Sequence, residues 1–311
     1  MKYRTLLAVL AIMLLTAACS TGGGASATAG GAATPSEAAS DAPSDSSEEP
    51  SAAAGDPNDL LAKIQEAGEI RVSTDPNYAP QSFQNPDGTF EGFDIDVANE
   101  IASRLGVTAK FEIPVWDLVV AGGWNERWDI SVGSAAITEE RKAVLDFTEP
   151  YYFTPAQMTA TTASGITDLE GLAGKAICVG SSTTYQFWLE GTLELGDGSQ
   201  PAPPPEGATA SPLETDQLCA QAIKSGRTEF DGWLSSSTTV EAAIKEDTPV
   251  VKVGDPVFYE PLAVATDKNG PPHAELQAEL DRIVQEMHSD GTLSELSKKW
   301  FDGLDLTQSA P

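Results

Sequence analysis

The chain has 311 residues and carries 47 aspartates and glutamates against 18 lysines and arginines, a formal charge of −29 at pH 7. Such an acidic chain argues against nucleic acid as a partner, because binding to phosphates requires clustered lysines and arginines. Beyond the N-terminus, no stretch is long and apolar enough for a transmembrane helix. Roughly 250 residues remain for a globular part, which is enough for two lobes with separate cores.

The first 19 residues have the plan of a secretory signal. Two basic residues precede the apolar run 6–15, and small residues follow up to Cys19. The run is too short to span a bilayer, and a cysteine after small residues is typical of a lipoprotein signal. Thr16 stands where lipoproteins usually carry leucine. We predict a signal peptide over residues 1–19 with a lipid on Cys19; a plain signal peptide is the alternative.

Residues 20–58 are rich in alanine, glycine, serine, threonine and proline, with scattered acidic residues and no lysine or arginine. This composition cannot bury a core, and it predicts a disordered segment. We expect it to be a solvated tether that holds the folded part away from a membrane surface.

Strand and helix patterns alternate through the rest of the chain, which predicts an α/β fold with mostly parallel sheets. The predicted helices cover 58–67, 91–105, 116–122, 166–172, a segment from 184, 216–225, 239–244 and 274–290. The predicted strands cover 70–74, 110–113, 129–132, 157–163, 175–179, 231–234, 250–253 and 262–266. Residues 191–212, rich in glycine and proline, are predicted to form a loop.

A candidate anion site follows the strand predicted at 129–132. Gly133, Ser134 and the two alanines after them form a small-residue turn whose N–H groups are open to a ligand. Thr138 is predicted to cap the next helix. Arg141, in the first turn of that helix, would add a two-pronged donor for a carboxylate beside the helix N-terminus. The alternative is a surface arginine beside an ordinary cap.

Five segments together resemble a known protein family. They are RVSTDPNYAP, DGTFEGFDIDVANEIASRLGV, ITEERKAVLDFTEPYY, DLEGLAGKAICVGSSTTY and SDGTLSELSKKWFDG, in this order along the chain. The sequence resembles the family-3 extracellular solute-binding proteins, which deliver polar amino acids to ABC importers. The resemblance implies a two-lobe periplasmic-binding-protein type II fold with a ligand cleft between lobes that are joined by two hinge crossings. It places the first lobe at 59–158, the second at 159–256 and the return to the first at 257–307.

The resemblance also implies where the ligand binds. The implied ligand-binding residues are Tyr78, Trp116, Gly133, Ser134, Thr138, Arg141, Ser182, Thr183, Thr184 and Ser236. Tyr78 would be an aromatic plate under the ligand, and the other possibility is a core-facing tyrosine. Trp116 would face the cleft, with a core position as the alternative. The hydroxyls at 182–184 would reach across the cleft, although one of them must also cap the helix after them.

One departure from the family concerns the residues after the strand DGWL. Amino-acid binders usually place there an aspartate that pairs with the ligand's ammonium, but this chain has serines at 235–237. An uncompensated buried ammonium is costly, so either another acid takes this position or the solute is not an ordinary α-amino acid. We expect Asp75 or Asp117 as substitutes, weak binding of common α-amino acids, and a solute whose amine is masked, displaced or directed toward Tyr78.

Two cysteines remain after Cys19 is assigned to the lipid. Cys178 lies in a predicted strand and Cys219 in a predicted helix. An exported chain with two remaining cysteines favours a disulfide between them. Separate buried thiols are the alternative.

The function expected from these features is capture of a small carboxylate-bearing polar solute by lobe closure, for an ABC permease and its ATPase. We expect an exported monomer anchored to the membrane by the lipid on Cys19, facing the outside or the periplasm. No catalytic residue, cofactor or metal is expected, and two histidines without a closely spaced Cys/His set argue against a catalytic zinc. The alternatives are a fold-related periplasmic dehydratase and a ligand sensor for a membrane receptor.

Overall fold

The computed structural model describes residues 55–308. The predicted signal peptide, Cys19 and nearly all of the predicted tether lie outside these residues, so those predictions stand as they are. Within residues 55–308, no helix is long and apolar enough to cross a membrane.

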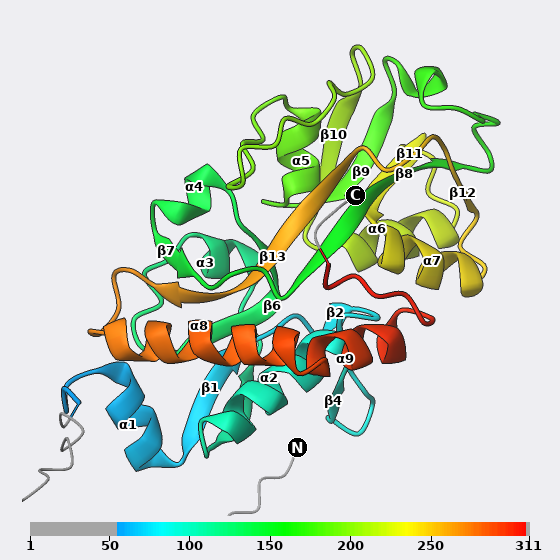
Figure 1. Ribbon diagram of the computed structural model, residues 1–311. Coiled ribbons are helices and arrows are strands. Elements are labelled where there is room, and N and C mark those ends of the chain that lie inside the picture. Colours follow the sequence, from blue (N-terminus) through cyan, green and yellow to red (C-terminus); the bar gives the residue numbers. More distant parts are fainter. Residues whose placement is uncertain (1–54, 309–311) are drawn as a thin grey trace, which may run out of the picture. The chain divides into compact units, whose positions relative to one another are not determined.

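The elements follow the predicted alternation of helices and strands (Figure 1). The part up to the first long strand contains α1 (Leu60–Ala67), β1 (Glu69–Ser73), β2 (Asn77–Tyr78), β3 (Ser82–Gln84), β4 (Phe90–Glu91), α2 (Phe93–Arg104), β5 (Thr108–Glu112), α3 (Trp116–Val120), β6 (Ile130–Ala136), α4 (Glu139–Lys142), β7 (Leu145–Phe147) and β8 (Tyr152–Thr161). The remaining part contains η1 (Glu170–Leu172), β9 (Ala176–Gly180), α5 (Thr184–Leu189), β10 (Thr209–Leu213), α6 (Asp216–Lys224), β11 (Gly232–Ser236), α7 (Ser237–Lys245), β12 (Val250–Lys252), β13 (Phe258–Asp267), α8 (Ala274–Ser289) and α9 (Thr292–Trp300).

Most strands belong to one sheet with the order β10-β9-β11-β8-β13-β6-β1-β5. The block β5-β1-β6 at one end and the block β10-β9-β11 at the other are parallel. The long strands β8 and β13 between the blocks pair antiparallel with each other and with their neighbours. The strands are therefore parallel within each block, and the two strands that connect the blocks are antiparallel to their neighbours.

The buried core changes along both connecting strands. On β8, Tyr152 packs with the core over β1 and β6, whereas Ala156 packs with the core over β9 and β11. On β13, Leu262 belongs to the first core and Phe258 to the second. We call the parts around these two cores the first and second lobes. Two strands thus connect the lobes, as the predicted hinge requires, while the exact lobe limits remain a prediction.

The local predictions succeed where a cap or a regular apolar pattern specifies the element. Thr138 caps α4 by accepting the Arg141 N–H, and Thr183 caps α5 in the same way through Gln186. The predicted helix 166–172 is wrong: only the 3-10 helix η1 forms, and Asp168, which precedes it, accepts the Gly171 N–H.

Three other segments differ from the sequence predictions. The strand predicted at 129–132 continues to Ala136, because Ala135 and Ala136 pair with β13. Part of the predicted loop 191–212 is the edge strand β10, where Pro212 is tolerated because an edge strand has one unpaired side. Helix α9 was not predicted, although its face packs on α2 and α8.

Cys178 of β9 and Cys219 of α6 form a disulfide, which confirms the predicted pairing. Both residues are fully buried in a core shared by β9, α6 and α7. The bond closes a loop with a sequence separation of 41 residues, which contributes about 4 kcal/mol to stability on the chain-entropy model.

Candidate functional site

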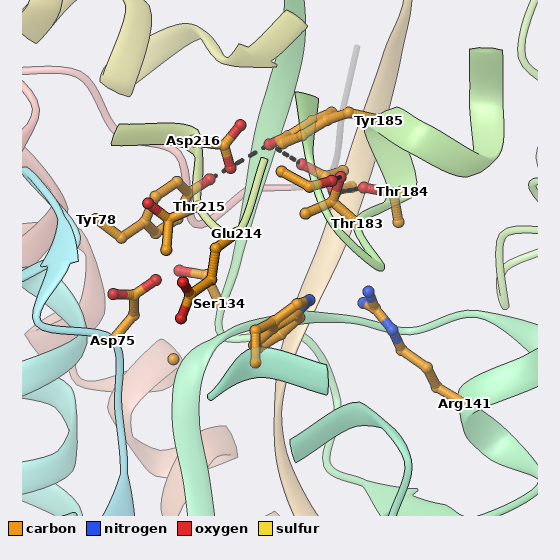
Figure 2. A pocket seen from close by; sticks show the side chains of 14 residues that line it. Asp75, Tyr78, Ser134, Arg141, Thr183, Thr184, Tyr185, Glu214, Thr215 and Asp216 are labelled. Carbon is orange, nitrogen blue, oxygen red and sulfur yellow. Dashed lines mark hydrogen bonds between the residues drawn. The ribbon is translucent and has the colours of Figure 1, made fainter. Parts of the chain in front are cut away.

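A pocket lies where β6, α4, β9, α5, α6 and β13 meet. About 490 Å³ of it is free of protein atoms, a volume that includes the solvent at its open mouth. Figure 2 shows the side chains that line it. They are Asp75, Tyr78, Trp116, Gly133, Ser134, Arg141, Gly180, Thr183, Thr184, Tyr185, Glu214, Thr215, Asp216 and Glu260.

Arg141 is the one basic residue of the pocket wall. Its side chain is 3% exposed, and its terminal nitrogens donate to the carbonyls of Ala136, at 3.0 Å, and Ser182, at 2.9 Å. Its Nε has no hydrogen-bond partner, and no carboxylate of the described residues forms an ion pair with it. Burial lowers the pKa of Arg141 to about 10, still well above neutral pH. The pocket therefore contains a permanent, buried positive charge with a free donor.

Trp116 stands beside this guanidinium. The centre of its ring lies 5.1 Å from the Arg141 Cζ, a cation–π contact. Its Nε1 donates to the Ser182 carbonyl at 3.1 Å, so Trp116 and Arg141 of the first lobe share one acceptor in the second. Ser182 has a left-handed backbone with φ of 55°, which costs energy for a residue other than glycine. The Ser182 carbonyl thus closes the pocket at the Arg141 end.

Ser134 also has a left-handed backbone within β6, with φ of 56°. Its hydroxyl donates to Asp94 at 2.7 Å and its N–H donates to the Tyr151 hydroxyl at 3.2 Å. The Tyr151 hydroxyl in turn donates to Asp94 at 2.7 Å. Burial raises the pKa of Asp94 to about 7, although both of these hydrogen bonds favour its charged form. Asp94 and Tyr151 therefore fix the unusual backbone of Ser134 from below the pocket.

Four carboxylates line the rest of the pocket. Asp75 comes from the first lobe, Glu214 follows β10, Asp216 is the first residue of α6, and Glu260 comes from β13. None of the four forms an ion pair with a lysine or arginine of the described residues. Glu260 accepts hydrogen bonds from the hydroxyls of Thr184 and Tyr185. One buried arginine thus shares the pocket with an excess of acid.

Burial raises the pKa of Asp216 to about 7, and repulsion from Glu260 adds to this effect. Burial also raises the pKa values of Glu260 and Asp75. A carboxyl group whose pKa is raised in this way ionises more readily when a cation arrives beside it. A cation beside these acids would therefore favour their ionised forms.

The model of the bacterial extracellular solute-binding proteins, family 3, matches residues 70–303. The chain belongs to this family. The match contains both connecting strands and every residue of the pocket wall.

Curated relatives of this solute-binding protein cover most of its length. The L-cystine-binding protein TcyJ of Escherichia coli K12 is 28% identical over 251 residues, which are 80% of this chain and 88% of the relative. The lysine/arginine/ornithine-binding periplasmic protein of the same organism is 26% identical over 234 residues, 75% of this chain and 87% of the relative.

Solved structures give the same fold. An ancestral amino acid-binding protein, AncCDT-1, described as a precursor of cyclohexadienyl dehydratase, has a TM-score of 0.65 at 29% identity and covers 78% of this chain and 99% of its own. A histidine-bound substrate-binding protein of an ABC uptake transporter from Streptococcus pneumoniae has a TM-score of 0.67 at 21% identity. The match covers 81% of this chain and 99% of the pneumococcal chain. The predicted two-lobe type II fold is confirmed.

The structure brings together seven of the ten residues that the resemblance assigned to the ligand: Tyr78, Trp116, Gly133, Ser134, Arg141, Thr183 and Thr184. Thr138 caps α4 under the pocket, Ser182 contributes its carbonyl, and Ser236 is buried behind the wall. These three residues lie outside the pocket wall. Ligand binding by all ten residues remains a prediction.

Of the two acids predicted to replace the one missing at residues 235–237, the structure places one in the pocket wall. Asp75 lines the pocket, but Asp117 is exposed on α3 and lies outside the pocket wall. Glu214, Asp216 and Glu260 were missed. The first two follow the strand β10, which the glycine- and proline-rich sequence around it concealed. An acid just after a strand and at the start of a helix was the available signal.

The pKa of Asp216 predicts how the stability of the ligand-free protein depends on pH. An aspartate of the unfolded chain loses its proton near pH 4, whereas Asp216 of the folded protein keeps it to about pH 7. Between these values the folded state binds more protons, so stability falls as pH rises from about 4 to about 7 and then levels off. Asp216→Asn removes this contribution.

Thermal unfolding of the ligand-free wild type and Asp216→Asn, measured from pH 4.5 to pH 8 at constant ionic strength, checks this prediction. The unfolding midpoint of the wild type is expected to decline more steeply than that of the variant. Glu260 and Asp75, the charged groups facing Asp216, are common to both proteins, so their contributions largely cancel. Parallel curves would show that Asp216 ionises with an ordinary pKa.

Proposed function

We propose that this protein is the solute-binding component of an amino-acid ABC importer and that it captures a free amino acid in the pocket at Arg141. The observation that carries the proposal is Arg141 itself, a buried guanidinium with a free Nε and no ion pair with an acid among the described residues. A buried charge without a counter-ion is costly. The carboxylate of an amino acid would supply that counter-ion in a bidentate contact.

The contacts between the lobes support capture by closure. Besides the Ser182 carbonyl, the Tyr78 and Tyr185 hydroxyls meet at 3.3 Å. Gln81 of the first lobe donates to Thr238 of the second at 2.8 Å. A solute that bridges Arg141 and the acids of the second lobe would have more contacts when the lobes are closed, so it would shift the equilibrium of the hinge toward closure.

The relatives support the amino-acid assignment by their names, which include binding proteins for cystine, arginine and histidine. The partners in this proposal are an ABC permease and its ATPase. The protein would act as an exported monomer, held to the membrane by a lipid on Cys19 and facing the outside or the periplasm. It would release its solute unchanged, without a cofactor.

A thermal-shift screen with the proteinogenic amino acids tests the binding function. A ligand at a hundred times its dissociation constant stabilises the folded state by about 2.7 kcal/mol, which raises the unfolding temperature by a few degrees for a protein of this size. We expect strong shifts for a small subset of the amino acids. If none of them shifts the unfolding temperature at millimolar concentration, the protein does not bind free amino acids.

The lipid anchor has a separate test. Cys19→Ala is expected to move the mature protein from the membrane fraction to the soluble fraction, because the single acceptor of the lipid is lost. Western blots of fractionated cells measure this distribution. If the variant stays with the membrane as fully as the wild type, another segment anchors the protein.

A dehydratase-type enzyme is the second candidate, and Asp216 is the observation that favours it. A carboxyl with a pKa of about 7 in a pocket could protonate a leaving group at neutral pH. The curated relatives named above are binding proteins, which favours capture without reaction. Incubation of a bound solute with the protein, followed by mass spectrometry of the released molecule, distinguishes the two: an importer component returns it unchanged, whereas a dehydratase removes water.

A further inference from the structure

The acids of the pocket specify the class of amino acid, an inference that rests on the function proposed above. We propose that Asp216 accepts the α-ammonium in place of the acid that is missing at Ser236, and that Asp75 and Glu214 bind a second cation. The preferred solute would then be an α-amino acid whose side chain ends in a positive charge.

Ser236 itself is not available to a ligand. Its side chain is buried, and it caps α7 by accepting the Thr239 N–H at 3.2 Å. Its hydroxyl also accepts from the Gln81 amide at 2.9 Å, a contact between the lobes. Ser236, where the resemblance predicts an acid, therefore forms a hydrogen bond between the two lobes in this chain. The ammonium of a bound amino acid needs another carboxylate.

Asp216 is placed to provide it. The residue is 7% exposed, its Oδ1 has no hydrogen-bond partner, and it lines the pocket as the first residue of α6. In Figure 2 its carboxylate lies beside the hydroxyl ends of Tyr78 and Tyr185. Gly180 permits this position, because a Cβ there would lie 3.2 Å from the Asp216 Oδ2. A buried carboxylate oxygen without a donor matches an ammonium group, which brings three N–H donors.

Glu260 is the other buried acid, but its two oxygens already have donors. Thr184 donates to one and Tyr185 to the other. Glu260 also lies on β13, one of the strands that connect the lobes. Of the two buried acids of the pocket, Asp216 is therefore the one with an oxygen that has no donor.

Asp75 and Glu214 form a second acidic site toward the mouth. Their carboxylates face each other in Figure 2, and the charge of Glu214 contributes to raising the pKa of Asp75, after the larger effect of burial. Both residues also line the hollow next to the pocket, which Ile113, Pro114 and Val115 border. A side chain that extends from the pocket toward this hollow would pass between the two acids.

The charges of the pocket lead to the same class of solute. An amino acid with a neutral side chain would neutralise Arg141 and Asp216 but would leave Asp75 and Glu214 repelling each other. A second cation would remove that repulsion, and it would restore the ionised form of Asp75, which burial disfavours. Arginine, lysine and ornithine have this charge pattern, whereas citrulline has nearly the shape of arginine without its charge.

Titration calorimetry with L-arginine and L-citrulline tests the proposal, using protein freed of retained solute by unfolding and refolding with the disulfide intact. We expect the wild type to bind arginine at least a hundredfold more tightly than citrulline. Asp216→Asn should weaken both ligands by on the order of a hundredfold, because both have an α-ammonium. The double variant Asp75→Asn/Glu214→Gln should weaken the binding of arginine but not of citrulline. The ratio of the two affinities should then be close to one.

Asp117→Asn and Glu66→Gln are the matched controls, since both residues are exposed and lie outside the pocket wall. Circular dichroism and thermal unfolding establish that each variant is folded. Equal affinities of the wild type for the two ligands, or unchanged affinities in Asp216→Asn, would overturn the proposal while leaving the amino-acid-binding function in place. If no amino acid binds the wild type, both the function and this inference fail.

Discussion

Replacing Arg141 with alanine is expected to weaken binding of the solute by about 2 to 5 kcal/mol, the usual cost of removing one partner of a buried charge pair. Arg141 is 3% exposed, lines the pocket and has an Nε without a hydrogen-bond partner, so the variant would leave the carboxylate of the solute without its counter-ion. Titration calorimetry with the best ligand of the thermal-shift screen measures the loss.

Two further variants separate this role from a structural one. Arg141→Lys retains the charge but loses the fork that fits a carboxylate, so it should recover only part of the affinity. Arg282→Ala removes an exposed arginine of α8 that pairs with Glu279 and Glu286, and it should bind like the wild type. A loss of less than a few fold in Arg141→Ala would show that the carboxylate is held elsewhere.

Loss of the disulfide is expected to have the largest effect on stability. The double variant Cys178→Ala/Cys219→Ala opens a loop with a sequence separation of 41 residues, and the free energy of unfolding should fall by about 4 kcal/mol. The bond also ties α6 to β9, so it holds Asp216 against Gly180. Urea unfolding followed by circular dichroism measures the change.

Wild type unfolded in the presence of a reductant is the matching comparison, because it lacks the bond but retains both sulfur atoms. Its stability should fall nearly to that of the double variant, with a small difference from the smaller alanine side chains. A change below about 1 kcal/mol in both cases would mean that the bond contributes little to the folded state, contrary to the entropy of closing a loop of this length.

The sequence specified the features that depend on neighbouring residues. The cap at Thr138 and the position of Arg141 in the following helix were predictable, because both follow from spacing within a single turn. The pairing of Cys178 with Cys219 was predictable for another reason: only two cysteines remained once Cys19 was assigned to the signal. The alternation of strands and helices was enough for the fold class.

The acidic residues of the pocket were harder to predict from the sequence. Asp75, Asp216 and Glu260 come from distant parts of the chain, and only the order of strands in the sheet brings them to one place. Ser182 was assigned to the site for its hydroxyl, yet it contributes its carbonyl, a group that every residue has. The left-handed backbones of Ser134 and Ser182 also have no sequence signal, because serine at such positions gives no sign comparable to glycine.

Native mass spectrometry of the protein purified from the cells that express it naturally tests the central claim most directly, because it identifies the solute held between Arg141 and Asp216. We expect a retained molecule with the mass of an α-amino acid whose side chain is cationic, present on the wild type and absent from Arg141→Ala. A retained molecule without a carboxylate, or an amino acid that stays bound to Arg141→Ala, would contradict it.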